Sequence, residues 1–206
     1  MREKKVAIIN YGLGNLVSIE SALIYLKIKN KIVNNPKDLK NFSHLILPGV
    51  GSFSAAMKNM IKFGWDKEIK KFYSNGKSIL GICLGMQMLF SDSNEFELSN
   101  GLGLIKGKCR KFSKEATNKI IIPHVGFNQV VFPDTAIWSG IDKNCSFYFV
   151  HTYRLKKIEP NVRCGYTTYG EKFVSFVEKK NIFGTQFHPE KSHSAGLKLL
   201  KNFVNI

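Results

Sequence analysis

The sequence predicts an α/β fold in which a mostly parallel central sheet is flanked by helices and the C-terminal half is rich in β-strands. In the first half, short apolar runs alternate with segments whose apolar residues recur at steps of three and four, as in strand–helix repeats. After Gly101 the segments become short, β-branched and aromatic, which is typical of strands. No repeat or linker interrupts the chain, so we expect one domain over residues 1–206.

The first half is expected to contain four strands of a mostly parallel sheet. Val6 to Asn10 is an apolar run that ends in a Gly-rich turn, and a helix follows from Leu16. Ser52 is a typical helix N-cap. The helix after Ser52 is expected to bury Phe53, Met57, Met60 and Ile61. The other expected elements are strands Lys31 to Asn34, His44 to Leu47 and Ser78 to Ile82, and a helix from Leu84 to Phe90.

The second half is expected to be mainly β-structure, closed by one amphipathic helix. That helix, Ser194 to Val204, carries Leu197, Leu200 and Phe203 at helical spacing. The expected strands are Leu104 to Phe112, Ile120 to Pro123, Asn128 to Phe132, Ser146 to Leu155, Val162 to Tyr169, Lys172 to Lys179 and Ile182 to Phe187.

Charge is the most unusual feature of the composition. Lys and Arg number 31 against 15 Asp and Glu, giving a formal net charge of +16, which a nucleic-acid or anionic-surface binder could carry. Only four of these cations are Arg, however, and bidentate base recognition relies on the guanidinium group. The lysines are also scattered. A basic nucleic-acid-binding module therefore stays as a less favoured alternative.

The sequence gives little indication of a membrane-spanning segment, a disulfide framework or a metal site. No apolar run approaches the roughly 20 residues of a spanning helix, and Met1 to Lys5 lack the layout of a signal peptide. The four cysteines form no CxxC pair and have no His at metal-ligand spacing. We expect a cytoplasmic protein with no cofactor, no metal and no membrane contact.

Gly81-Ile-Cys83-Leu-Gly85 lies where an apolar strand turns directly into a helix, the setting of the nucleophile elbow of many hydrolases. The flanking glycines are expected to allow a sharp turn that needs positive φ and leaves no room for Cβ atoms. A cysteine there lies at a helix N-terminus, whose partial positive charge favours the thiolate. The alternative is a small buried core cysteine, but the paired glycines favour catalysis.

Gln186-Phe-His188-Pro-Glu190 supplies a candidate base and a group to hold it. On an extended backbone residues two apart face the same side, so Glu190 can orient the His188 imidazole. Pro189 is expected to support an extended conformation because it cannot occupy a helix interior. One His-x-Glu pattern alone is weak evidence. Together with the Cys83 elbow, it completes a candidate Cys–His–Glu triad.

The Pro48 to Gly51 loop follows a predicted parallel strand and is expected at the same sheet edge as Cys83. Its glycines allow a backbone N–H to turn toward a developing oxyanion, and the N–H of Leu84 is the expected second donor. A turn with no chemical role is the alternative. Gly12-Leu-Gly14 matches half of a dinucleotide fingerprint, but Val17 replaces the third glycine, so no nucleotide site is expected.

Taken together, these features resemble the class I (triad) glutamine amidotransferases, and most closely the glutaminase subunits of imidazole glycerol phosphate synthases. The resemblance spans nearly the whole chain and implies a class I glutaminase-like fold. The motifs that carry it are Tyr11-Gly-x-Gly-Asn-Leu16, Leu47-Pro-Gly-Val-Gly-x-Phe53, Gly81-Ile-Cys-Leu-Gly-Met-Gln87, Pro123-His-Val-Gly-Phe-Asn128, Tyr148-Phe-Val-His-Thr-Tyr153 and Gln186-Phe-His-Pro-Glu-Lys-Ser192.

The resemblance implies that Cys83 attacks the side-chain carboxamide of L-glutamine, that His188 acts as general base and acid, and that Glu190 orients His188. A γ-glutamyl thioester would form and be hydrolysed, giving glutamate and ammonia. A solvated helix residue is the alternative for Gln87. The oxyanion and glutamine-binding positions that the resemblance implies are Gly49, Val50, Gly51, Leu84, Gln87, Thr152 and Tyr153.

The resemblance also implies a partner, a (β/α)₈ cyclase subunit that forms a heterodimer with the glutaminase and uses its ammonia in a step of histidine biosynthesis. Asn15 and Lys191 match family positions at the subunit interface. Asn10, Phe127 and Arg154 depart from the family pattern, which usually has Asp, Trp and a second aromatic there. These departures leave open a paralogue that supplies ammonia for amidination of a bacterial surface sugar. A thiol hydrolase acting on another amide is a third possibility.

Overall fold

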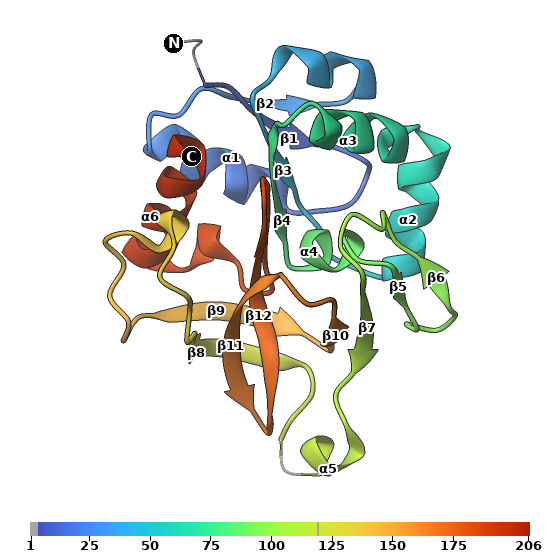
Figure 1. Ribbon diagram of the computed structural model, residues 1–206, viewed down its shortest axis with the longest axis vertical. Helices are drawn as coiled ribbons and strands as arrows, with labels where there is room; N and C mark the ends of the chain where they lie inside the picture. Colours follow the sequence, from blue (N-terminus) through green and yellow to red (C-terminus); the bar gives the residue numbers. More distant parts are fainter. Residues whose placement is uncertain (1–3, 119) are drawn as a thin grey trace.

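The computed structural model describes residues 4–118 and 120–206 and builds them around a long mixed β-sheet (Figure 1). The strand order is β2-β1-β3-β4-β13-β12-β10-β7-β5-β6, with β11 paired to β12, and β8 and β9 form a separate two-stranded sheet. Met1 to Glu3, part of the segment assessed for a signal peptide, lie outside the described residues. The α/β class with a mostly parallel half is as predicted.

Parallel strands form the part of the sheet that positions the site. β1, β3, β4 and β13 are buried along almost their whole length, which explains why their sequences are apolar without alternation. β3 and β13 flank β4, so the residues that follow their carboxyl ends meet at one edge of the sheet. These strands are β1 (Val6–Ile9), β2 (Asn30–Val33), β3 (His44–Leu47), β4 (Ser78–Ile82) and β13 (Ile182–Thr185).

Helices cover both faces of these strands (Figure 1). α1 and α6 pack against one apolar cluster, and α2 and α3 pack against the other. The longer helices are α1 (Leu16–Tyr25), α2 (Phe53–Lys62), α3 (Trp65–Ser74) and α6 (His193–Asn205). The shorter ones are α4 (Leu84–Met88), α5 (Lys114–Thr117) and the 3₁₀ turns η1 (Pro36–Asn41), η2 (Ala136–Trp138) and η3 (Pro189–Lys191).

Helices α2 and α3 show where the spacing of apolar residues predicts the structure and where it does not. Ser52 caps α2 as predicted, because its Oγ accepts a hydrogen bond from the Ala55 N–H at 3.3 Å. The prediction that Ile61 faces the core is wrong, since its side chain is 61% exposed. The buried face of α2 ends at Met60, one position earlier. α3 was not predicted from the sequence.

The second half is mainly antiparallel, as predicted, but several strand boundaries differ. Ile120 to Pro123 is an irregular segment rather than a strand, and β8 begins at His124 and overlaps the predicted strand Asn128 to Phe132 only at its first two residues. The predicted strand Ser146 to Leu155 breaks at Thr152, because β9 pairs with β8 whereas β10 joins the main sheet beside β7. These strands are β5 (Asp92–Ser93), β6 (Ser99–Asn100), β7 (Gly107–Lys111), β8 (His124–Gln129), β9 (Ser146–His151), β10 (Tyr153–Ile158), β11 (Arg163–Tyr169) and β12 (Glu171–Lys179).

The described residues hold neither a membrane-spanning helix nor a cluster of metal ligands. Across 4–118 and 120–206, every helix is too short or too polar to cross a bilayer. In the same ranges, no group of three or more His, Cys, Asp or Glu side chains could hold a metal ion.

His44 links stability to pH. It begins β3 almost fully buried, with its ring edge against Phe203 of α6, and burial together with the charge of Lys4 lowers its pKa from 6.5 to about 4. The unfolded chain therefore binds this proton more readily than the folded chain. Above about pH 6.5 His44 is neutral in both the folded and the unfolded chain, and it costs no stability. As pH falls toward 4, the unfolded chain takes up this proton first, and the free energy of unfolding decreases.

We predict that His44→Leu flattens this dependence. Replacing the titrating ring with an apolar side chain should reduce the loss of unfolding free energy between pH 7.5 and pH 5 by about 1 to 2 kcal/mol relative to the wild type. Urea titrations at the two pH values measure that difference. An unchanged difference in His44→Leu would mean that the His44 pKa is not lowered by folding.

Candidate active site

Cys83 occupies a strained turn between β4 and α4. Its own φ is 55°, in the left-handed region that residues with side chains seldom adopt. The expectation that the flanking glycines supply the positive φ is wrong, since neither Gly81 nor Gly85 is in that region. Glycine is needed at these two positions because neither has room for a Cβ atom. A Cβ on Gly85 would lie 1.9 Å from the Leu47 carbonyl oxygen, and one on Gly81 would lie 2.7 Å from the Gly85 backbone.

His188 and Glu190 form a buried pair beside Cys83. The His188 Nδ1–H donates to Glu190 Oε1 at 2.7 Å, which leaves Nε2 as the ring nitrogen available for chemistry. The predicted contact is present, but the predicted extended backbone is only partly correct. His188 is extended, whereas Pro189 begins the 3₁₀ turn η3 that carries Glu190. Pro is compatible with that first position because its missing N–H has no partner to lose.

The two neighbours of His188 determine its protonation. Burial lowers the pKa of His188, but hydrogen bonds to Cys83 and Glu190, and the charges of both, outweigh burial and raise it from 6.5 to about 10. The ring is therefore an imidazolium at neutral pH when the Cys83 sulfur is a thiolate. Such a pair needs no separate deprotonation step before attack.

A cavity of about 320 Å³ opens over Cys83 and His188. Most of the positions expected to contact glutamine line it. Gly49 does not, because it packs behind the cavity, where an added Cβ would lie 2.6 Å from the Gly85 nitrogen. The described residues that line the cavity are Val50, Gly51, Cys83, Leu84, Gln87, Glu95, Pro123, Val150, His151, Thr152, Tyr153 and His188. A larger groove of about 610 Å³ beside β2 contains none of the triad.

The two positions expected at a subunit interface lie outside the cavity. The Asn15 side chain caps α1 by accepting from the Ser18 N–H at 3.3 Å, a local role that was not predicted from the sequence. Lys191 is exposed, and its Nζ lies 5.8 Å from the centroid of the Tyr148 ring. Lys191 adjoins Glu190 in η3, so it is close to the triad without lining the cavity.

Comparisons with known proteins agree with this geometry. Residues 7–206 match the family model "Glutamine amidotransferase class-I". The chain belongs to the class I glutamine amidotransferase family. It is 42% identical over 200 residues to the imidazole glycerol phosphate synthase subunit HisH of Sulfurimonas denitrificans, which covers 97% of each chain. It is 45% identical over 199 residues to the subunit of that name from Caldanaerobacter subterraneus, with 96% of each chain covered.

Solved structures share the fold at lower identity. PurLQS from Thermotoga maritima superposes with a TM-score of 0.75 at 23% identity, covering 98% of each chain. A crystal structure described as a glutamine amidotransferase superposes with a TM-score of 0.74 at 18% identity, covering 97% of each chain. The class I amidotransferase fold is therefore shown by structure as well as by sequence.

Two contacts at or near the cavity of this class I amidotransferase were not predicted from the sequence. Glu95 lines the cavity, and its Oε2 accepts from the Phe53 N–H at the start of α2 at 2.7 Å. Tyr11 lies below the Pro48 to Gly51 loop and donates its hydroxyl to the Pro48 carbonyl at 2.9 Å. Burial and the charge of Cys83 raise the pKa of Tyr11, so it remains a donor. Only tertiary folding brings these residues to the site.

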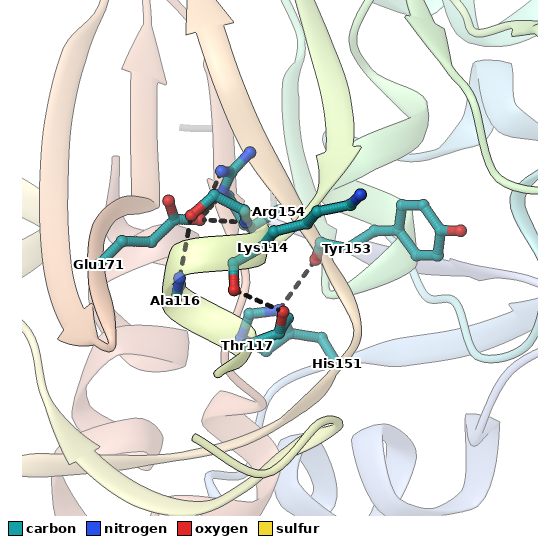
Figure 2. Close-up of polar contacts among 8 residues, drawn as sticks. Lys114, Ala116, Thr117, His151, Tyr153, Arg154 and Glu171 are labelled. Atoms are coloured by element: carbon teal, nitrogen blue, oxygen red, sulfur yellow. Dashed lines mark hydrogen bonds and ion pairs between the residues drawn. The ribbon is translucent and has the colours of Figure 1, made fainter. Parts of the chain in front are cut away.

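Arg154, which the resemblance marks as unusual, is buried on β10 in contact with Glu171 (Figure 2). It is 4% exposed, and its Nε donates to Glu171 at 2.8 Å while Nη2 also contacts that carboxylate. Its guanidinium carbon lies 5.6 Å from the Phe112 ring centroid. Because side chains alternate along β10, Arg154 points away from the side of Tyr153 that borders the cavity.

We predict that Gly85→Ala removes the site. Its Cβ would meet the carbonyl of Leu47 in β3, which cannot move without disturbing the sheet, so a large fall in Tm and loss of glutamine turnover are expected. Gly103→Ala is the control, because nothing lies within 4 Å of its added Cβ and it should cost only about 1 to 2 kcal/mol for its positive φ. Equal effects in the two variants would contradict the steric role of Gly85 in the elbow.

Proposed function

We propose that this chain hydrolyses L-glutamine to glutamate and ammonia as the glutaminase subunit of an imidazole glycerol phosphate synthase. The observation that carries the proposal is that Cys83 and His188 line one cavity and Glu190 holds His188 from behind, in a chain about 40% identical over nearly its full length to relatives named HisH. Cys83 is the proposed nucleophile, His188 the general acid and base, and Glu190 the residue that orients His188.

The geometry supports a two-stage mechanism. The Cys83 thiolate attacks the carboxamide carbon, and His188 gives its proton to the nitrogen, so that the C–N bond breaks and ammonia leaves a γ-glutamyl thioester. His188, now neutral, then accepts a proton from water, and the hydroxide attacks the thioester. The C–S bond breaks, glutamate departs, and the thiolate–imidazolium pair is restored.

Charge stabilisation comes from backbone groups in this proposal. Leu84 follows the nucleophile at the start of α4, where N–H groups lack helical partners and can face an oxyanion. Val50 and Gly51 border the cavity on the opposite side and are the proposed second source. Gly49 supports this loop by its contact with Gly85 rather than by touching substrate.

Glutamine carries an ammonium and a carboxylate in addition to its amide, and apart from His188 the described lining of the cavity offers an oppositely charged side chain only to the ammonium. Glu95 is the one carboxylate among the described lining residues, so we assign it to the ammonium group. No Lys or Arg occurs among those lining residues, so in this proposal uncharged donors bind the substrate carboxylate. Gln87, Thr152 and Tyr153 complete the proposed glutamine site.

The partner in this proposal is a (β/α)₈ cyclase subunit that receives the ammonia, because the relatives are named as synthase subunits. The surface beside the triad favours a protein partner: Val125 and Phe127 on β8 are 55% and 50% exposed, and Lys191 is exposed close by. Phe127 stacks on His193 with ring centroids 5.1 Å apart. Asn15 and Lys191 remain the proposed interface positions, and the cytoplasm the proposed location.

We predict that Cys83→Ala abolishes glutamine-dependent formation of imidazole glycerol phosphate by the complex with the cyclase subunit of the same genome. Ammonia-dependent formation should persist, because the acceptor chemistry takes place on the partner. Cys145→Ala, which lies outside the cavity, should leave both activities unchanged. Glutamine turnover by Cys83→Ala would refute the triad, and a wild-type complex inactive with the nucleotide substrate would favour the surface-sugar alternative.

We predict that Glu95→Gln weakens glutamine binding more than it slows chemistry. Losing a charge-assisted contact with the ammonium should raise KM about tenfold or more, with kcat within about twofold of the wild type. Glu97→Gln is a matched control two residues away, because Glu97 pairs with Lys58 on the surface. Steady-state glutaminase kinetics of both variants give KM and kcat separately. A fall in kcat at unchanged KM would assign Glu95 a different role.

A further inference from the structure

Gln186, which precedes the His188 motif by two residues, is fully buried and directs its amide at the nucleophile. Its Nε2 lies 3.7 Å from Cys83 Sγ, a distance suited to the large radius of sulfur. It follows β13, the strand beside β4, so both side chains leave the sheet at the same edge. The proposed mechanism gives Gln186 no task, and the sequence marks it only as part of a motif.

The orientation of that amide is fixed by its neighbours. The Tyr153 carbonyl can only accept, so the group of Gln87 that lies 3.0 Å from it must be the NH₂. The same NH₂ also donates to Gln186 Oε1 at 2.9 Å. The Gln186 oxygen is thereby committed to Gln87, and its NH₂ group is the end that faces the sulfur.

The Tyr153 carbonyl is held from a second side. His151 Nδ1 donates to it at 2.8 Å, as Figure 2 shows, and this assigns the proton of neutral His151 to Nδ1. His151 Nε2 must then accept from His124 Nδ1, 3.0 Å away. Burial lowers the pKa of His151 to about 3 and that of His124 to about 4, so both rings are neutral near pH 7 and the donor directions hold.

The contacts of Cys83 Sγ favour its two protonation states differently. The Val150 carbonyl lies 3.8 Å from the sulfur and can only accept, so it stabilises the thiol. The Gln186 NH₂ can only donate, so it stabilises the thiolate. The Gln186 amide cannot flip, because its NH₂ would then face the NH₂ of Gln87. Two buried donors that face each other without an acceptor are destabilising.

We propose that Gln186 is a further catalytic residue, which donates a hydrogen bond to the Cys83 sulfur and holds the thiolate for attack. The Gln87 amide and the Tyr153 carbonyl fix its direction, and the His151–His124 pair fixes that carbonyl. The proposal rests on Cys83 being the nucleophile of the proposed function, but its test does not require glutamine turnover.

The test is the pH dependence of Cys83 alkylation by iodoacetamide in the full chain, followed by mass spectrometry of the peptide that contains Cys83. Gln186→Met keeps the shape of the side chain and removes the donor. Its pH midpoint of alkylation should rise by about one unit and its rate at pH 7 should fall about tenfold, with the high-pH rate within about twofold of the wild type. Gln186→Glu should raise the midpoint further, because it adds a like charge beside the sulfur.

Asn202→Leu is the matched control. Asn202 is a buried amide that donates to the Ile137 and Ser139 carbonyls away from the cavity, so its loss should lower stability without moving the alkylation midpoint. A midpoint in both Gln186 variants equal to that of the wild type, or an equal shift in Asn202→Leu, would overturn the proposal. Protection of wild-type Cys83 by glutamine reports separately on the proposed function, because that function fails if glutamine does not slow alkylation.

Discussion

The close packing of the β3 carboxyl end against the turn that follows β4 is the constraint on which the site depends. The Leu47 carbonyl lies where a Cβ of residue 85 would be, and Gly49 fits against the first turn of α4 only because it has no side chain. This contact fixes the distance between the Pro48 to Gly51 loop and the nucleophile. It also leaves Cys83 with a positive φ, so the strain is located at the proposed nucleophile.

Two imidazoles at the same cavity have opposite protonation because their partners differ. His188 contacts a carboxylate and a thiol, both of which can carry negative charge, and its pKa rises to about 10. Burial, together with the charges of His124, His188 and Arg154, lowers the pKa of His151 to about 3, although its hydrogen bond to the Tyr153 carbonyl acts in the opposite direction. Burial acts in the same direction on both. The neighbouring groups therefore decide which ring is charged at neutral pH and which one stays neutral.

The parts of the site that the sequence predicts are those carried by local patterns. The Gly81 to Gly85 turn and the His188–Glu190 pair each lie within five residues, so their glycines, proline and spacing mark them directly. The contacts of Glu95 and Gln186 carry no such mark, although Gln186 belongs to the His188 motif, because their partners are Phe53 and Cys83, 42 and 103 residues away. Strands buried on both faces were predictable from apolar runs, whereas the break at Thr152 was not, because it depends on which sheet each half joins.

The net charge of +16 does not reflect the charges around the candidate active site. The described residues around the cavity include Glu95 but no Lys or Arg, and Glu190 is buried behind His188. A lysine beside Cys83 would compete with His188 as the counter-ion of the thiolate, and its proton would not be delivered to the departing nitrogen. Without another cation among the described lining residues, His188 can serve as both the counter-ion and the acid in the proposed mechanism. The surplus of lysines is therefore located away from the described lining of the cavity.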